Sequence, residues 1–107
     1  MFSRLHPVTD ADFDRVVERA TVPVLVEFWK PGCGHCQSLM KELELLQDEL
    51  GEKVLVLTMN VDDNFQIPAE LEVFSLPALA LYRNGLFERF IGGLGKKAEI
   101  LRQLQNG

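Results

Sequence analysis

The sequence predicts a single α/β domain in which helices flank a mixed β-sheet. Its 107 residues, 47% of them hydrophobic and 25% charged, can bury one core but leave no room for a second domain. Two apolar runs, residues 22–29 and 54–57, enclose a segment with helical spacing, and a helix between strands favours parallel pairing. An Asn84-Gly85 turn later in the chain favours an antiparallel hairpin.

The N-terminal segment should supply an edge strand, a helix and a central strand. Residues 2–6 are expected to form the short edge strand. Thr9, with Asp12 as its partner three residues on, should cap a helix that reaches about residue 20. Residues 22–29 have the apolar, β-branched pattern of a central strand covered on both faces.

The middle of the chain predicts a long helix, a second buried strand and a short helix. Over residues 34–50 the apolar side chains recur at helical spacing and charged side chains fill the remaining positions, and Gly51 should end this helix. Residues 54–57 are expected to form the second buried strand. A loop follows, and a short helix is predicted after Pro68.

Two strands and a helix complete the predicted order β-α-β-α-β-α-β-β-α. The strands, residues 78–82 and 86–91, should pair across the Asn-Gly turn. The last helix has an apolar face made by Ile100, Leu101 and Leu104.

The charge of the chain disfavours two classes of partner. With 11 basic and 16 acidic residues the net charge is −5, which would repel phosphate backbones and anionic lipid, so neither nucleic acid nor a membrane is an expected partner. The first residues lack the apolar run of a signal peptide, and no stretch approaches the length of a membrane span. The sequence therefore predicts a cytoplasmic protein.

The two cysteines, Cys33 and Cys36, lie where the central strand runs into the long helix. A helix N-terminus favours negative charge, so the first thiol should ionise more readily than a free cysteine. A structural zinc site would need four ligands, but the chain has one cysteine pair and only two histidines. A structural disulfide is disfavoured because a bridge between residues three apart removes little chain entropy. The pair is interpreted as redox-active, and no metal or cofactor is expected.

Four motifs stand in register along the chain: Val26-Glu27-Phe28-Trp29, Cys33-Gly34-His35-Cys36, Leu76-Pro77-Ala78, and Asn84-Gly85 ahead of Ile91-Gly92. Together with the element order they resemble the thioredoxin family across nearly the whole chain. A lone Cys-x-x-Cys would be weak evidence, but four motifs in register are specific. The resemblance implies the thioredoxin fold and a thiol–disulfide oxidoreductase.

The resemblance assigns roles to the cysteine motif. It implies that Cys33 attacks a substrate disulfide and that Cys36 then resolves the mixed disulfide, in agreement with their expected places on the helix. His35 stands where similar motifs in protein disulfide isomerases have histidine, and it can stabilise the Cys33 thiolate. The alternative is a solvated surface histidine.

Glu27 and Trp29 precede the motif on the central strand. The resemblance implies that Glu27 is a buried proton acceptor for Cys36, and burial without a cation should raise the pKa of its carboxyl. The alternative is a glutamate at the strand end that reaches solvent. Trp29 is expected to pack below the active loop rather than take part in the chemistry.

The substrate-binding residues are predicted to lie on three loops. Pro77 matches a cis-proline that faces the thiols in the family, and the alternative is a trans proline that starts a strand. The Leu76 backbone could then pair with an extended substrate, and Gly92 would permit close approach. Gly32 and Gly34, on either side of the first cysteine, complete this predicted surface.

Three positions depart from the family pattern. Gly32 replaces a tryptophan, so the surface that contacts substrates should be smaller. The family's range of partners is therefore not expected to carry over to this chain. Thr58 replaces a lysine near the buried acid, which favours a raised Glu27 pKa. Lys41 replaces a helix-kinking proline, so the long helix should run straighter.

The leading functional hypothesis is a monomeric reductase of protein disulfides, itself re-reduced by a flavoprotein similar to thioredoxin reductase. The first alternative is a disulfide oxidase or isomerase, which the histidine in the motif favours. The second is a binding or assembly module whose thiols are incidental.

Overall fold

A five-stranded mixed sheet forms the centre of the molecule. The computed structural model describes residues 5–93 and 95–106. The strands are β1 (His6–Pro7), β2 (Val24–Trp29), β3 (Leu55–Asn60), β4 (Ala78–Arg83) and β5 (Leu86–Phe90). They lie in the order β1-β3-β2-β4-β5; β3 is parallel to β1 and β2, and β4 is antiparallel to β2 and β5. The predicted α/β class with a mixed sheet is confirmed.

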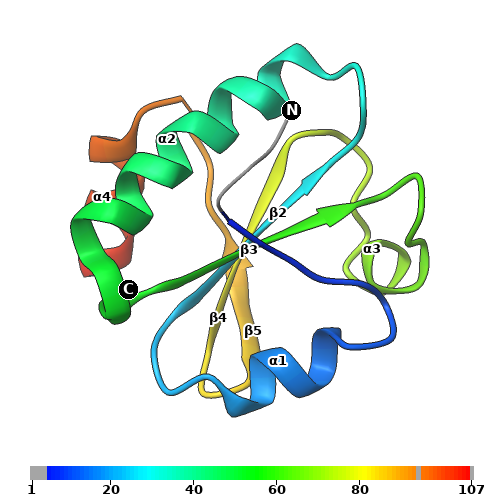
Figure 1. Ribbon diagram of the computed structural model, residues 1–107, viewed down its shortest axis with the longest axis horizontal. Coiled ribbons are helices and arrows are strands. Elements are labelled where there is room, and N and C mark those ends of the chain that lie inside the picture. Colours follow the sequence, from blue (N-terminus) through cyan, green and yellow to red (C-terminus); the bar gives the residue numbers. More distant parts are fainter. Residues whose placement is uncertain (1–4, 94, 107) are drawn as a thin grey trace.

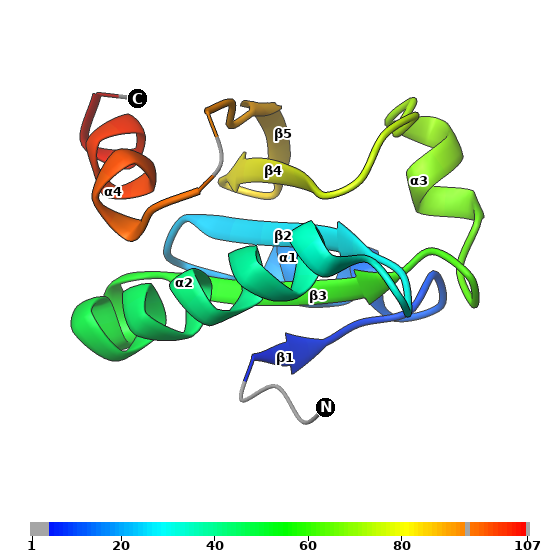
Figure 2. The same ribbon diagram turned by 90° about the horizontal axis from the view of Figure 1, so that it is seen from above.

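Helices cover both faces of the sheet. They are α1 (Phe13–Arg19), α2 (Gly34–Leu50), α3 (Gln66–Glu70) and α4 (Lys97–Asn106). Figure 1 shows α2 and α4 on one side of the sheet and α1 and α3 on the other, and Figure 2 gives the same arrangement from above. The predicted order of elements is confirmed, with one short 3-10 helix (Gly51–Lys53) added after α2.

Strand β2 is buried on both faces, as its composition predicts. Val24, Val26 and Phe28 pack in the core on the α1 and α3 side. Leu25 packs in the core below α2 and α4. Because side chains alternate along a strand, Glu27 points to the same side as Leu25, towards the layer that contains α2. The cysteine-bearing helix and the buried acid therefore share one face of the sheet.

Helix α2 confirms the predicted bounds and end signal. It runs unbroken from Gly34 through Lys41 to Leu50, and Gly51 follows it with a φ of 55°. This left-handed backbone is what glycine tolerates at a helix C-terminus. The side chain of Gln47 fixes the same end, since it donates to the Gly51 and Val54 carbonyls and accepts from the Val56 N–H.

The predicted cap of the first helix is wrong by three residues. Helix α1 begins at Phe13, with Asp12 and not Thr9 as its N-cap residue, and it ends at Arg19. The Asp12 carboxylate accepts hydrogen bonds from the Thr9 N–H at 2.7 Å and the Thr9 hydroxyl at 3.2 Å. The pair predicted from the sequence does interact, but it closes a turn that precedes the helix.

Several other boundaries differ from the prediction; β4 and β5, for example, end at Arg83 and Phe90 rather than at residues 82 and 91. The edge strand is His6–Pro7, and residues 2–4 of the predicted strand lie outside the described residues. Strand β2 begins at Val24 rather than at residue 22. Strand β3 extends to Asn60, past the predicted end at residue 57, because it pairs with β2 as far as Trp29.

The short third helix begins earlier than predicted. Helix α3 starts at Gln66 and includes Pro68 in its first turn, where a missing N–H is tolerated. The Asp10 carboxylate accepts hydrogen bonds from the Gln66 and Ile67 N–H groups, each at 2.9 Å. This cap comes from a distant segment of the chain, which explains why local sequence placed the start after the proline.

The β4–β5 hairpin is confirmed, with an irregularity that the sequence did not reveal. Leu81 pairs with Arg89 and Tyr82 pairs with Phe87, so Glu88 is an extra residue at a β-bulge. Phe90 pairs with Ala80, and Ala80 and Tyr82 belong to the same core. The bulge therefore places the aromatic rings of residues 87 and 90 on one face of the sheet, although the residues are three apart.

Candidate active site

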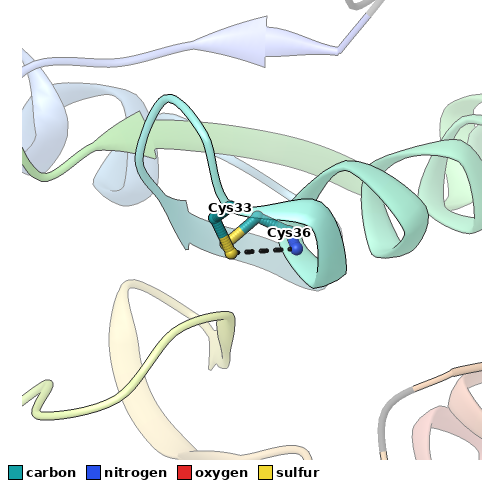
Figure 3. The surroundings of a disulfide bond; sticks show 2 residues. All are labelled: Cys33 and Cys36. Atoms are coloured by element: carbon teal, nitrogen blue, oxygen red, sulfur yellow. Dashed lines mark hydrogen bonds between the residues drawn. A yellow bond between two sulfur atoms is a disulfide. The ribbon is translucent and has the colours of Figure 1, made fainter.

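The cysteine motif forms the first turn of α2. Figure 3 shows Cys33 and Cys36 joined by a disulfide at the helix start, and their Cα atoms are 5.2 Å apart. Cys33 is the N-cap residue, and its Sγ accepts a hydrogen bond of 3.1 Å from the Cys36 N–H. Because the N–H groups of a first helical turn have no intrahelical partner, this position stabilises negative charge on the Cys33 sulfur.

The two sulfur-bearing residues differ in exposure. Cys33 is partly exposed, while Cys36 is fully buried against the sheet. A molecule that approaches from solvent therefore meets Cys33 first. This asymmetry is the one that the sequence predicted from the positions of the two residues on the helix.

Glu27 is completely buried, which excludes the alternative of a glutamate that reaches solvent. Neither carboxylate oxygen has a hydrogen-bond partner among the described residues. Desolvation raises the pKa of Glu27 to about 8. Its neighbours in register are Thr58 on β3 and Leu79 on β4, and neither supplies a cation. Its surroundings thus keep the carboxyl mostly protonated at neutral pH, with a minority ionised.

Trp29 lies at the end of β2, directly before the cysteine loop. It is partly buried and packs against the core below α2 and α4, so the predicted packing role agrees with its position. Its carbonyl accepts a hydrogen bond of 2.9 Å from the Val61 N–H. The end of β2 is thereby tied to the segment that follows β3.

Pro77 and His35 line the same pocket, of about 250 Å³, together with Ser38, Leu39 and Gly95. The Leu76–Pro77 peptide bond is cis, so the alternative of a trans proline is wrong. Leu76 lies two residues before Ala78, where the β2–β4 ladder begins, so its backbone lies outside that ladder. The fold therefore brings the loop before β4 next to the cysteine motif, as the sequence predicted.

The glycines near the site have different conformations. Gly32 has a φ of 83°, in the left-handed region that side chains rarely adopt. This backbone conformation explains why glycine is favoured at position 32. Gly34 and Gly92 do not have this conformation, and a Cβ atom at either position would meet open space.

A second pocket, which the sequence did not reveal, lies beside the site. It has a volume of about 400 Å³ and lies between the loop before β4 and the segment after β5. The lining residues are Glu72, Val73, Phe74, Ser75, Pro77, Ala78, Leu79, Phe90, Ile91, Gly92 and Gly93. Its signal in the sequence is weak, since only an aromatic residue in a loop, Phe74, marks the position.

Comparison with known proteins decides the family. The sequence profile of the family described as Thioredoxin matches residues 4–106. The chain belongs to the thioredoxin family. It is 44% identical to a thioredoxin from Haemophilus influenzae over 81 residues, which are 76% of this chain and 75% of that one. Thioredoxins from Rickettsia felis and Streptomyces clavuligerus are 39% and 35% identical, over 88% and 92% of this chain and 90% and 91% of their own.

This membership gives the cysteine turn its chemical meaning. The chain is a thiol–disulfide oxidoreductase, and the thioredoxin fold predicted from the sequence is confirmed. The alternative of a binding or assembly module whose thiols are incidental is therefore not supported. Among the described residues, no helix is long and apolar enough to cross a membrane.

Proposed function

We propose that this protein reduces protein disulfides through a dithiol–disulfide cycle of Cys33 and Cys36. The observation that carries the proposal is the partly exposed Cys33 at the start of α2, with the buried Cys36 bonded behind it. The Cys33 thiolate attacks one substrate sulfur and expels the other as a thiolate, which leaves a mixed disulfide. Cys36 then attacks the Cys33 sulfur, closes the internal disulfide and releases the second substrate thiol. Two electrons pass to the substrate.

Glu27 is proposed as the proton acceptor for Cys36. Its buried carboxyl faces the layer that contains α2, and both oxygens are free to exchange a proton. With a pKa of about 8, a minority of the Glu27 carboxyl is ionised near neutral pH, and this ionised form accepts the proton of Cys36 as that thiol attacks. Thr58 in the neighbouring strand leaves this acid without a cation, which distinguishes the site from relatives that carry a lysine there.

The loops around the thiols are proposed to bind the substrate chain. The Leu76 backbone lies outside the β4 ladder and beside the cis Pro77, so it can pair with an extended segment. Gly92 and the glycines on either side of Cys33 leave room for that segment to approach. Recognition through the backbone would allow many protein disulfides to serve as substrates.

The cycle needs an electron donor, and we propose a thioredoxin-reductase-like flavoprotein. Continuous reduction of substrates requires a compartment in which thiols stay reduced, so a cytoplasmic location belongs to the same proposal. We further propose that residues 1–107 form one domain and that the protein acts as a monomer.

The decisive experiment separates the roles of the two thiols. Cys33→Ser should abolish disulfide reduction and mixed-disulfide formation, because the attacking sulfur is absent. Cys36→Ser should still capture the substrate covalently but fail to release it. Non-reducing gel electrophoresis with mass spectrometry would measure the trapped complex, and equal trapping by both variants would refute the assignment.

An oxidase or isomerase remains the second candidate, because His35 lies at the pocket that also contains Pro77. The two functions differ in redox potential, which is about −270 mV for thioredoxin and about −180 mV for protein disulfide isomerase. If His35 stabilises the Cys33 thiolate, the potential should lie at about −240 to −200 mV, and His35→Pro should lower it. Titration against glutathione measures both values. A wild-type potential at or below about −270 mV, unchanged in His35→Pro, would exclude the isomerase-like function.

A further inference from the structure

The pocket of about 400 Å³ described above adjoins the active site. Pro77 lines this pocket and also lines the pocket that contains His35 of the cysteine motif. We call the larger one the apolar pocket; its walls are the loop that carries Phe74 and the end of β5 that carries Phe90. A substrate segment held beside Pro77 therefore has a cleft next to it that could receive one of its side chains.

Phe90 forms a fixed wall of the apolar pocket. The bulge at Glu88 places Phe87 and Phe90 on one face, and their ring centroids are 5.1 Å apart in an edge-to-face contact. Phe87 in turn contacts Tyr82 at 5.6 Å, and Tyr82 is buried in the core. This chain of rings holds Phe90 in place, although the side chain remains 39% exposed.

Phe74 forms the opposite wall and is 88% exposed. A single exposed aromatic residue is ordinary, but this one borders a pocket that adjoins the reactive turn. Covering exposed aromatic surface of this kind with a second apolar group is energetically favourable, because both surfaces are removed from water. The pocket is therefore suited to an apolar group that arrives with the substrate.

One carboxylate stands beside the apolar walls. Glu72 is the single charged residue among the described residues that line the apolar pocket. Its backbone has a φ of 58°, and its N–H donates to the Ala69 carbonyl at 3.1 Å, so the residue is fixed in a left-handed turn at the end of α3. A negative charge in this place favours a basic group beside the apolar one.

We propose that the apolar pocket is a specificity subsite for the substrate protein, and this inference rests on the proposed reductase function. It takes a large apolar side chain, aromatic or aliphatic, from the extended segment that carries the reacting cysteine. Glu72 selects segments in which a lysine or arginine is next to that side chain. The preferred substrates are thus disulfides flanked by an apolar and basic sequence, rather than small disulfides.

The test uses disulfide-linked peptide dimers and pre-reduced protein, which itself supplies the two electrons. In one peptide series a Phe stands two, three or four residues before or after the cysteine, and a Lys stands next to that Phe. Matched series replace the Phe by Ala or the Lys by Glu. For the best placement, the second-order rate constant should be about tenfold higher with Phe than with Ala, as one pocket contact typically gives.

Two variants connect the preference to the pocket. Phe74→Ala should reduce the Phe-to-Ala rate ratio from about tenfold to about one. Glu72→Gln should remove a Lys-to-Glu preference of about threefold, which should also fade at high salt because exposed charges are screened. The control is Phe65→Ala, which removes another aromatic side chain, 82% exposed, that does not line the pocket. It should keep the wild-type ratio.

The outcomes separate this inference from the function on which it rests. Reduction of every peptide at one common rate, or an equal loss of ratio in Phe74→Ala and Phe65→Ala, would refute the subsite while the reductase function stands. If the wild-type protein reduces neither the peptides nor oxidised glutathione, both the subsite and the reductase function are overturned. A higher rate with Phe peptides that Phe74→Ala removes and Phe65→Ala retains supports the proposal.

Discussion

Glu27 and Asn64 are both buried polar residues, but their hydrogen bonding is opposite. The Asn64 amide is satisfied, since it accepts from the Asp10 N–H at 2.8 Å and donates to the Asn60 carbonyl at 3.0 Å. Neither oxygen of Glu27 has a partner among the described residues. A satisfied buried group holds segments together, whereas an unsatisfied acid destabilises the fold and shifts its own pKa. The contrast separates a structural residue from the residue that we propose as the proton acceptor for Cys36.

The region around Asn64 shows what satisfied polar groups achieve. Asp10, whose N–H binds Asn64, also accepts from two N–H groups at the start of α3. The loop before α1 is joined there to a distant stretch of the chain, which runs from the end of β3 to the start of α3. The described residues around Glu27 instead leave its carboxyl without a hydrogen bond, and we propose that this carboxyl takes part in proton transfer.

Replacement of Glu27 should have the largest effect, and its sign depends on pH. The folded chain keeps the proton up to a pKa of about 8, whereas the unfolded chain loses it near the ordinary value of 4.5. Folding therefore takes up a proton between these pH values, so the free energy of unfolding falls as the pH rises through this window. Glu27→Gln should remove this decline and be more stable than wild type by on the order of 4 kcal/mol above pH 8.

Urea unfolding at pH 5, 7 and 9 would measure this difference. The exposed Glu52 offers the matched control, since Glu52→Gln should follow the wild-type curve at all three pH values. An identical pH profile for wild type and Glu27→Gln would show that Glu27 is not protonated in the folded state at neutral pH.

Replacement of Asn64 should have a smaller effect, which is a loss of stability that does not depend on pH. Asn64→Ala leaves the Asp10 N–H and the Asn60 carbonyl without their partner, and stability should fall by about 2 kcal/mol. Thermal unfolding at pH 5 and 9 would test this, with the exposed Gln105→Ala as control. The rate of oxidised glutathione reduction per folded molecule should stay the same. A loss that disappears at one of the two pH values would contradict a purely structural role.

Removal of the carboxylate that caps α3 should have the smallest effect. Asp10→Ala should lower the free energy of unfolding by about 1 kcal/mol, as loss of a capping side chain typically does. The control is Asp62→Ala, which removes an exposed carboxylate that lies shortly before α3 in the sequence. Equal stability of the two variants would mean that the Asp10 hydrogen bonds contribute nothing net.

Local patterns account for the parts of the fold that the sequence predicted correctly. The bounds of α2 follow from helical spacing and from Gly51, and the hairpin follows from Asn84 and Gly85, which have φ values of 54° and 80°. The burial of Glu27 follows from the apolar residues around it in the strand.

The features that were missed depend on contacts between distant segments. The start of α3 is set by Asp10, and the extra length of β3 by its pairing with β2. The apolar pocket exists because the bulge at Glu88 turns Phe90 to one face and the chain brings Phe74 opposite. None of these is encoded in a window of neighbouring residues, so spacing and propensity alone do not reveal them.

The strand order has a consequence for the newborn chain. Strand β2, which leads into the cysteine turn, has β3 on one side and β4 on the other, and both are synthesised after it. Because the ribosome adds residues in sequence, no part of this sheet can assemble until residues 55–60 have emerged, and β2 lacks its second neighbour until residue 82 follows. Both cysteines therefore leave the ribosome well before the sheet that buries one of them. During synthesis they meet the thiols and oxidants of the cell as an unprotected pair.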